Sequence, residues 1–271
     1  MISSCFFFSI LGGIIKFLSE FIHPFEQAFF RNFFSIFIIG FFLLKFGENP
    51  FKSKKKKLLF VRSIFGVITM LLLFWSYALI PLSQAMAISF TTPLFIFIGG
   101  IFIMKESVSR SNIVALILGF IFTLIIIKPE TNVDFGTLIA ILAAMTHAVT
   151  GLIVKGLTKS ETVLSIMFFM VIFMTPLSSL PLFYQWEFPK NNFVWALLFL
   201  LAVVGTLGNY CWTKALSLSE LTNVMPFDFS KLIFATLIGY FFFKEDLDVT
   251  TMICGIGIIL CNIQISKIQK K

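Results

Sequence analysis

Two charged residues, Asp228 and Lys231, lie within the long apolar stretch from Leu221 to Phe243. Their i,i+3 spacing places both side chains on one face of a helix, where the carboxylate and the ammonium can pair. Lys231 lies about 12 residues, or roughly 18 Å of helix, before the polar end of this stretch, so its ammonium cannot easily reach that end. The two groups could neutralise each other, or they could separate to bind the two ends of a zwitterion. Pro226 lacks a backbone donor and is expected to loosen the helix just before the pair.

Arg31 is a second charge in an apolar setting, within the segment HPFEQAFFRNFFSIF of residues 23–37. It follows the predicted start of its helix at Phe25 by roughly 7–9 Å along the axis. An arginine at the centre of a membrane helix costs about 2.5–3.5 kcal/mol on insertion scales. The side chain could extend to the nearer membrane surface, pair with Glu26, or face a cavity and bind a carboxylate or phosphate of a substrate. The pairing with Glu26 is disfavoured because residues five apart diverge by roughly 140° around a helix.

His147 lies in the segment ILAAMTHAVTG beside a stripe of small residues that suits close helix packing, namely Ala140, Ala144, Ala148 and Gly151. The imidazole could form a hydrogen bond across a helix interface or serve as a substrate or proton site, and the sequence favours neither. Further residues that could line the same cavity are Asn209, Tyr210, Trp75 and Tyr77. Aromatic residues in membrane proteins more often pack or lie at the membrane interface.

Motifs for other chemistries are absent from the sequence. It contains no GxxxxGK[ST] loop for ATP, no HExxH and no GxSxG, and its histidines are far apart. The four cysteines are scattered through apolar stretches without the paired spacing of metal sites. We therefore expect no catalytic residue, no metal and no cofactor, and a membrane enzyme is disfavoured.

The amino-acid composition indicates whether the chain is surrounded by water or by lipid. Hydrophobic residues make up 58% of the 271 residues, charged residues only 13%, and the mean hydropathy is +1.00. Soluble domains are about 45–50% apolar and about 25% charged, so we predict an integral membrane protein. The net charge of +8 does not indicate nucleic-acid binding, because the basic residues cluster between apolar stretches as they do in cytoplasmic loops.

The apolar stretches predict ten transmembrane helices and an all-α fold. They cover Ile2–Glu20, Pro24–Leu44, Leu58–Ile80, Ser83–Met104, Asn112–Ile127, Phe135–Val154, Val163–Tyr184, Phe193–Leu216, Leu221–Phe243 and Val249–Ile265. The distribution of lysine and arginine places both termini and the second, fourth and sixth connections in the cytoplasm. The largest cluster of these inward charges lies in the second connection and comprises Lys45, Lys52, Lys54, Lys55, Lys56, Lys57 and Arg62.

The two halves of the chain resemble each other. The stretch that ends in FIMKE at Glu106 is similar to the stretch that ends in FFFKE at Glu245, about half the chain later. This similarity predicts one five-helix repeat over residues 1–130 and a second over residues 131–271. Because five is an odd number of spans, the second repeat must enter the membrane from the opposite side.

The charges of equivalent connections agree with this inversion. The connection after the fourth span carries Lys105 and Arg110, whereas its counterpart in the second half carries Lys244 but also Glu245, Asp246 and Asp248. Related sequence with reversed charge is typical of inverted-topology repeats in secondary transporters, whose substrate site lies where the halves meet.

These features resemble the EamA-type branch of the drug/metabolite transporter superfamily over nearly the whole chain. The resemblance depends on HPFEQAFFRNFF at the second span, on the ends FIMKE and FFFKE, and most specifically on PFDFSKLIFATLIGYFFFKE, from Pro226 to Glu245. This last segment resembles the ninth span of a bacterial group that includes S-adenosylmethionine uptake carriers. The family implies a ten-helix basket in the inner membrane with a central cavity, which transports small metabolites by alternating access. The two halves differ in one respect: Pro93 of the first half has no proline counterpart in the matching segment SKLIF of the second half.

The leading hypothesis is a secondary carrier for a small zwitterionic or anionic metabolite, and the resemblance favours S-adenosylmethionine. Its partners would be this solute, the lipid bilayer, and a coupling proton or a counter-transported metabolite. Export of amino acids or other metabolites and the flipping of a lipid-linked carrier are the alternatives. The expected substrate site contains Arg31, Asp228, Lys231 and His147, with Asn209, Tyr210, Trp75 and Tyr77 as further contributors.

Overall fold

The computed structural model describes residues 1–53, 55–80, 88–127, 134–183, 186, 188–189, 191–243 and 249–268. These residues form helices and short connections, and no strand occurs among them. The α-helices are α1 (Ile2–Leu18), α2 (Pro24–Phe46), α3 (Lys56–Leu79), α5 (Thr92–Phe102), α6 (Arg110–Ile127), α7 (Phe135–Leu157), α8 (Val163–Ser178), α9 (Asn192–Leu218), α10 (Leu221–Val224), α11 (Ser230–Phe243) and α12 (Val249–Ile268). Short 3₁₀ segments are η1 (Pro50–Lys52), η2 (Leu180–Phe183) and η3 (Met225–Phe229).

The described helices have the lengths and apolar character of a multi-pass membrane protein. Six segments are long and apolar enough to cross a membrane, and α1, α5 and Met252–Gln264 are shorter apolar helices. The six are Pro24–Phe46, Arg110–Ile127, Phe135–Leu157, Val163–Phe183, Asn192–Leu218 and Leu221–Phe242. The prediction of an all-α membrane fold is therefore confirmed for this part of the chain. The predicted fourth span, Ser83–Met104, is described only from residue 88 onward, because residues 81–87 lie outside the described ranges.

Helix α2 illustrates how the sequence distributes its phenylalanines. The helix begins after His23, whose Nδ1 accepts a hydrogen bond from the Phe25 N–H, and Pro24 occupies the first turn, where its missing donor is harmless. Phe37 and Phe41 are exposed on one side, whereas Asn32 and Ser35 are buried on the other. The apolar side suits lipid contact, and the polar side faces the interior of the bundle.

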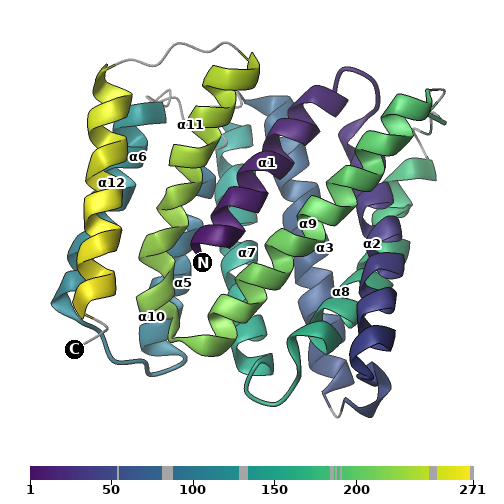
Figure 1. Ribbon diagram of the computed structural model, residues 1–271, viewed down its shortest axis with the longest axis horizontal. Helices are drawn as coiled ribbons and strands as arrows, with labels where there is room; N and C mark the ends of the chain where they lie inside the picture. Colours follow the sequence, from purple (N-terminus) through teal and green to yellow (C-terminus); the bar gives the residue numbers. More distant parts are fainter. Residues whose placement is uncertain are drawn as a thin grey trace.

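Most extensive helix contacts join a helix before residue 128 to a helix after residue 134. Helix α1 packs on α9 and α11, α2 on α8 and α9, α3 on α7 and α8, α5 on α7, and α6 on α12. Figure 1 shows these helices as one bundle, with α6 and α12 together at one edge and α2 and α8 at the other. The bundle core is therefore built from residues that are far apart in sequence.

The predicted packing stripe on α7 is confirmed. Ala140, Ala144 and Ala148 are almost fully buried. A β-carbon at Gly151 would lie only 2.8 Å from Ile96 Cδ1, so only glycine permits α5 to approach α7 this closely. Such small-residue contacts let membrane helices pack without a hydrophobic driving force.

The predicted ninth span is not one continuous helix. It consists of α10, the 3₁₀ segment η3 and α11 in direct succession. The break occurs at MPFDF, where Pro226 has no N–H to donate and the backbone tightens to the i→i+3 pattern of a 3₁₀ turn. The break therefore places Asp228 in η3 and Lys231 in the first turn of α11.

Candidate functional site

An ion pair lies at the break in the ninth span. Lys231 Nζ lies 2.7 Å from Asp228 Oδ2, and the side chains are 24% and 9% exposed. The other carboxylate oxygen, Asp228 Oδ1, is buried and has no hydrogen-bond partner among the described residues. The predicted pairing of these two residues is present, and it leaves one acceptor oxygen available to another group.

Helix α1 covers this ion pair. Ser9 Oγ lies 2.9 Å from the carbonyl oxygen of Lys231, and Cys5 Sγ lies 3.4 Å from the carbonyl oxygen of Phe227. Lys231 Nζ lies 5.6 Å from the centroid of the Phe8 ring, within range of a cation–π interaction. Cys5, Phe8 and Ser9 follow helical i,i+3,i+4 spacing, so one face of α1 packs against the break. Figure 1 places the N-terminal end of α1 about midway along the bundle, so the ion pair lies near mid-depth.

His147 on α7 lies between the charged groups of the bundle. Its ring centroid is 6.2 Å from that of Trp212 on α9, and Trp212 is buried. The charges of Lys231, Asp228 and Arg62 all act on the imidazole. The imidazole itself remains accessible to solvent despite its position within the span. His147 therefore lies within electrostatic range of Asp228 and Lys231.

Arg31 faces the interior of the bundle and is only partly accessible. Its stem lies across Gly205 of α9, where a β-carbon would come within 3.3 Å of Arg31 Cδ. One turn later on α2, Ser35 accepts a hydrogen bond from Thr206 on α9 (2.9 Å), and the neighbouring Asn32 donates to Ser178 on α8. Glu26, five residues earlier on α2, is buried.

Arg62 was not recognised as a site residue in the sequence. The charge pattern groups it with the lysines at 52–57 in a cytoplasmic connection, but it lies in the second turn of α3 and is only 5% exposed. Its Nη1 lies 3.6 Å from Met174 Sδ on α8, and its Nε is buried without a hydrogen-bond partner among the described residues. The signal that could have identified it is its position inside the apolar segment LLFVRSIFGV, since a loop charge would precede such a segment.

The remaining predicted residues do not gather at this point. Asn209 donates to the Gly205 carbonyl oxygen of its own helix (2.9 Å), and Tyr210 is 39% exposed. Trp75 is 49% exposed and stacks edge-on against Phe135. It lines an apolar cavity of about 530 Å³ together with Phe25, Ile68, Leu71 and Leu72. The side chain of Tyr77 lies outside the described residues.

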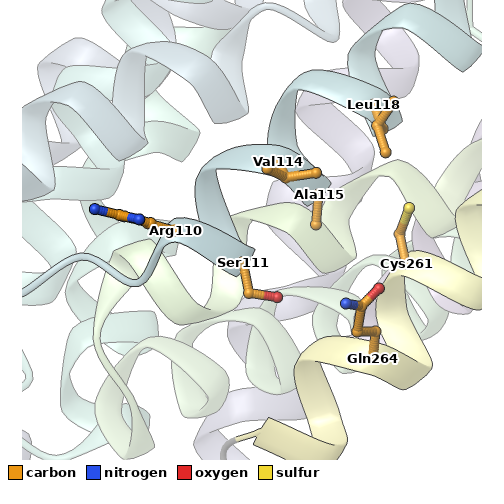
Figure 2. A pocket seen from close by; sticks show the side chains of 7 residues that line it. All are labelled: Arg110, Ser111, Val114, Ala115, Leu118, Cys261 and Gln264. Carbon is orange, nitrogen blue, oxygen red and sulfur yellow. The ribbon is translucent and has the colours of Figure 1, made fainter.

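A second cavity lies at the edge of the bundle. It measures about 300 Å³ and is formed by α6 and α12, as Figure 2 shows, with a lining of Arg110, Ser111, Val114, Ala115, Leu118, Cys261 and Gln264. The Arg110 side chain points away from the gap between Ser111 and Gln264. None of the predicted site residues lines this cavity, so we do not assign it to the substrate.

The start of the ninth span is fixed by charged side chains from two other helices. Glu106, after α5, accepts hydrogen bonds from the backbone N–H groups of Leu221 and Thr222, each at 2.9 Å. Lys155 at the end of α7 donates to the carbonyl oxygens of Leu216 (2.8 Å) and Ser219 at the end of α9. These bonds satisfy donors and acceptors that helix ends otherwise leave unpaired, and they hold α10 and therefore η3 in place.

Within the described residues, the interior of the bundle thus presents a carboxylate with an open oxygen, an ammonium, an imidazole and two guanidinium groups. These groups come from η3, α11, α7, α2 and α3, which are contributed by both halves of the sequence. Such a set can bind a small molecule that carries both a cationic and an anionic group. Charged residues inside a membrane span commonly serve such a purpose, because their burial is costly.

Comparison with known proteins agrees with this chemistry. The chain matches the EamA-like transporter family over residues 1–128 and 134–265. The S-adenosylmethionine uptake transporter of Rickettsia prowazekii is 32% identical over 270 residues, which cover 97% of this chain and 90% of the relative. The pseudopaline exporter CntI of Pseudomonas aeruginosa is 24% identical over 268 residues, which cover 98% and 94%. A protein of known crystal structure has the same fold, with a TM-score of 0.81 at 13% identity over 98% of this chain and 96% of the other.

The family match spans nearly the whole chain, and the relatives are bacterial transporters of small molecules rather than enzymes. The chain therefore belongs to the EamA-like transporter family, as a multi-pass protein of the bacterial inner membrane that transports a small metabolite.

Proposed function

We propose that the protein takes up a small zwitterionic metabolite, S-adenosylmethionine or a close chemical relative, by alternating access. The observation that carries this proposal is the Asp228–Lys231 ion pair at the break of the ninth span, with Asp228 Oδ1 buried and unpartnered among the described residues. The 32% identity to an S-adenosylmethionine uptake transporter supports the choice of substrate.

The ion pair suits a zwitterion because each of its members can exchange its partner. Asp228 can accept a hydrogen bond from a substrate ammonium or lie against a sulfonium, while Lys231 turns to a substrate carboxylate. A net-neutral zwitterion leaves the net charge inside the membrane unchanged, which avoids the cost of an unpaired charge at this depth. S-adenosylmethionine adds one positive charge through its sulfonium, and the Asp228 carboxylate is the group that can offset it.

Alternating access follows from two inverted halves, residues 1–130 and 131–271. The helix contacts support this division, because exchanging equivalent helices preserves the most extensive contacts. The pair α1–α9 corresponds to α7–α3, α1–α11 to α7–α5, and α2–α9 to α8–α3. The two segments that match the family, 1–128 and 134–265, have nearly the same boundaries. The halves would rock about the site that lies between them.

The orientation of the chain is part of the same proposal. Both termini lie in the cytoplasm, because the lysine-rich connection at residues 45–57 belongs on that side. The Glu106 and Lys155 contacts with the ends of α9 and α10 then close the cytoplasmic end of the substrate pathway. Their release would open the site inward.

Uptake into proteoliposomes tests the proposal. Labelled S-adenosylmethionine would be offered beside a panel of amino acids, nucleosides and riboflavin, to the wild type and to Lys231→Ala, with exposed Lys214→Ala as the matched control. We expect saturable uptake of S-adenosylmethionine that is lost in Lys231→Ala and kept in Lys214→Ala. Equal uptake by Lys231→Ala would remove the ion pair from the substrate site.

The same vesicles test the direction of transport and whether transport is coupled to protons or to exchange of a second solute. Loading the substrate inside and measuring its release tests export, which the pseudopaline exporter represents among the relatives. Uptake that follows an imposed pH gradient would indicate proton coupling through Asp228 or His147. Uptake that requires unlabelled substrate inside would indicate exchange. Transport of none of these solutes would direct the search to a lipid-linked cargo.

A further inference from the structure

Arg62 is a buried charge whose nearest described partner is not an acid. The side chain is 5% exposed, its Nη1 touches the thioether of Met174, and its Nε is buried without a hydrogen-bond partner. Among the described residues no carboxylate lies within ion-pair distance of it. A thioether sulfur is a weak acceptor, so the guanidinium keeps most of its hydrogen-bonding capacity unused.

The Arg62 side chain extends into the bundle rather than toward the nearer surface. Helix α3 begins at Lys56, and Arg62 Nη1 lies 3.6 Å from the position that a β-carbon would take at Gly66, one turn deeper. Side chains on a helix ordinarily lean toward its N-terminal end, and a snorkelling arginine here would lean toward Lys56. The absence of a side chain at Gly66 leaves the space that this inward direction requires.

Arg31 reaches the same region from α2. Met174, which touches Arg62, lies one turn before Ser178 on α8, and Ser178 accepts a hydrogen bond from Asn32, the residue next to Arg31. The charge of Arg31 lies within electrostatic range of the Arg62 guanidinium. Two guanidinium groups thus lie within electrostatic range of each other in a low-dielectric interior, without a neutralising carboxylate among the described residues.

Two like charges so placed repel each other, and each pays for the loss of its hydration. An anion between the two guanidinium groups attracts both of them and replaces the hydration that each has lost. The planar guanidinium fork binds a carboxylate through two parallel hydrogen bonds. We infer that Arg31 and Arg62 together form a binding site for the carboxylate group of the transported metabolite. This inference rests on the proposed function and refines it: the substrate carboxylate lies at the two arginines instead of at Lys231, so the two ends of the substrate occupy different parts of the pathway.

The same assignment indicates which part of the substrate the other charged groups would contact. With the carboxylate at the arginines, the cationic part of the substrate faces Asp228, whose Oδ1 is open. His147 lies within electrostatic range of Arg62 as well as of Asp228 and Lys231. A substrate with a carboxylate and a separate cationic centre would satisfy both ends at once.

Binding of paired ligands to the purified full-length protein tests the inference. The affinity of S-adenosylmethionine would be compared with that of its decarboxylated analogue by calorimetry, in the wild type, Arg62→Gln, Arg31→Gln and the control Lys214→Gln. We expect both arginine variants to lose about 10- to 100-fold in affinity for the carboxylate form and to bind the analogue as the wild type does. An equal loss for both ligands would overturn the inference. Competition by inorganic phosphate but not by acetate would identify a phosphate site instead.

Thermal unfolding without ligand gives a readout that does not depend on the identity of the substrate. We expect Arg62→Met, in buffer without carboxylates, to raise the Tm by about 2 °C or more, because it removes a repelling charge and adds an apolar contact to Met174. A lower Tm would mean that Arg62 neutralises a carboxylate of the protein, and would overturn the inference. If S-adenosylmethionine is not the substrate, the uptake assay fails, but the Tm of Arg62→Met still tests whether the Arg62 charge is unneutralised in the empty protein.

Discussion

The carboxylate of Glu106 accepts a hydrogen bond from the backbone N–H of Thr222, 2.9 Å away and 116 residues later in the sequence. Its second oxygen accepts from the N–H of Leu221 at the same distance. One carboxylate therefore caps the first turn of the ninth span, and it comes from a connection in the first half of the chain. Because α10 continues directly into η3, this cap helps to position Asp228.

We predict that Glu106→Gln weakens this cap. The amide has one acceptor oxygen instead of two and lacks the negative charge that a helix N-terminus favours. Unfolding in detergent should become easier by about 1 kcal/mol, within the usual range for a lost cap, and uptake should fall. Glu20→Gln, in an exposed turn, should leave both quantities unchanged. An unaltered Tm in Glu106→Gln would show that the cap does not anchor the span.

The ion pair at the break gives a second prediction. Asp228→Asn leaves the Lys231 ammonium without its partner and should cost about 3 kcal/mol of stability, the lower end for buried pairs, because Lys231 is 24% exposed. The double variant Asp228→Asn with Lys231→Met should recover most of this stability, since no charge remains unpaired. It should not recover uptake, which we expect to be reduced at least about 10-fold. Recovery of uptake together with stability would assign the pair a purely structural role.

A third prediction concerns the packing behind the break. A β-carbon at Gly119 on α6 would lie 2.5 Å from Phe229 Cδ2, the last residue of η3. Gly119→Ala must therefore displace the fully buried Phe229 ring and shift the neighbouring Asp228, at a cost of about 1–3 kcal/mol. Gly40→Ala is the control, because nothing lies within 4 Å of its β-carbon. Thermal unfolding and uptake should both be impaired in the first variant only, and a silent Gly119→Ala would contradict the geometry of η3.

The start of α7 gives a pH-dependent prediction. The N–H and hydroxyl of Thr137 both donate to Asp134 Oδ1 at 2.9 Å, and these bonds hold the pKa of the carboxyl below its ordinary value. A carboxyl whose pKa is lowered by folding stabilises the fold above its unfolded pKa, and this stabilisation is lost as the pH falls through the folded pKa. The Tm difference between wild type and Asp134→Ala should be largest near neutral pH and shrink below about pH 4. Asp134→Asn, which can still cap without a charge, should lie closer to the wild type than Asp134→Ala at each pH, with the same dependence on pH. A difference that grows in acid would refute the assignment.

The sequence predicted the class of fold because lipid imposes a simple rule on composition and on the length of apolar stretches. It also predicted the Asp228–Lys231 pair, since an i,i+3 spacing brings side chains together in a 3₁₀ turn as well as in an α-helix. Only Pro226 indicated in the sequence that the ninth span is interrupted. Its 3₁₀ form depends on Glu106 and on α1, which sequence spacing does not reveal.

Arg62 was misplaced for a physical reason. A basic residue near a run of lysines normally belongs to the same cytoplasmic loop, and only the burial of α3 against α8 separates it from that run. Trp75 and Tyr210 were expected in the site because of their chemistry, but a helix that is apolar on every side does not indicate which face points inward. Contacts such as Asn32 with Ser178 supply that direction, and they arise only when distant helices meet.

The packing of early helices on late ones has a consequence for biosynthesis. Helices α1, α2, α3, α5 and α6 have their most extensive contacts with helices that follow residue 134. When the first five spans leave the ribosome, their inward faces, including Arg31 and Arg62, still lack these partners. Closing such distant contacts is slow compared with forming local ones. The charged faces of the nascent first half therefore stay without their packing partners until the second half has been synthesised.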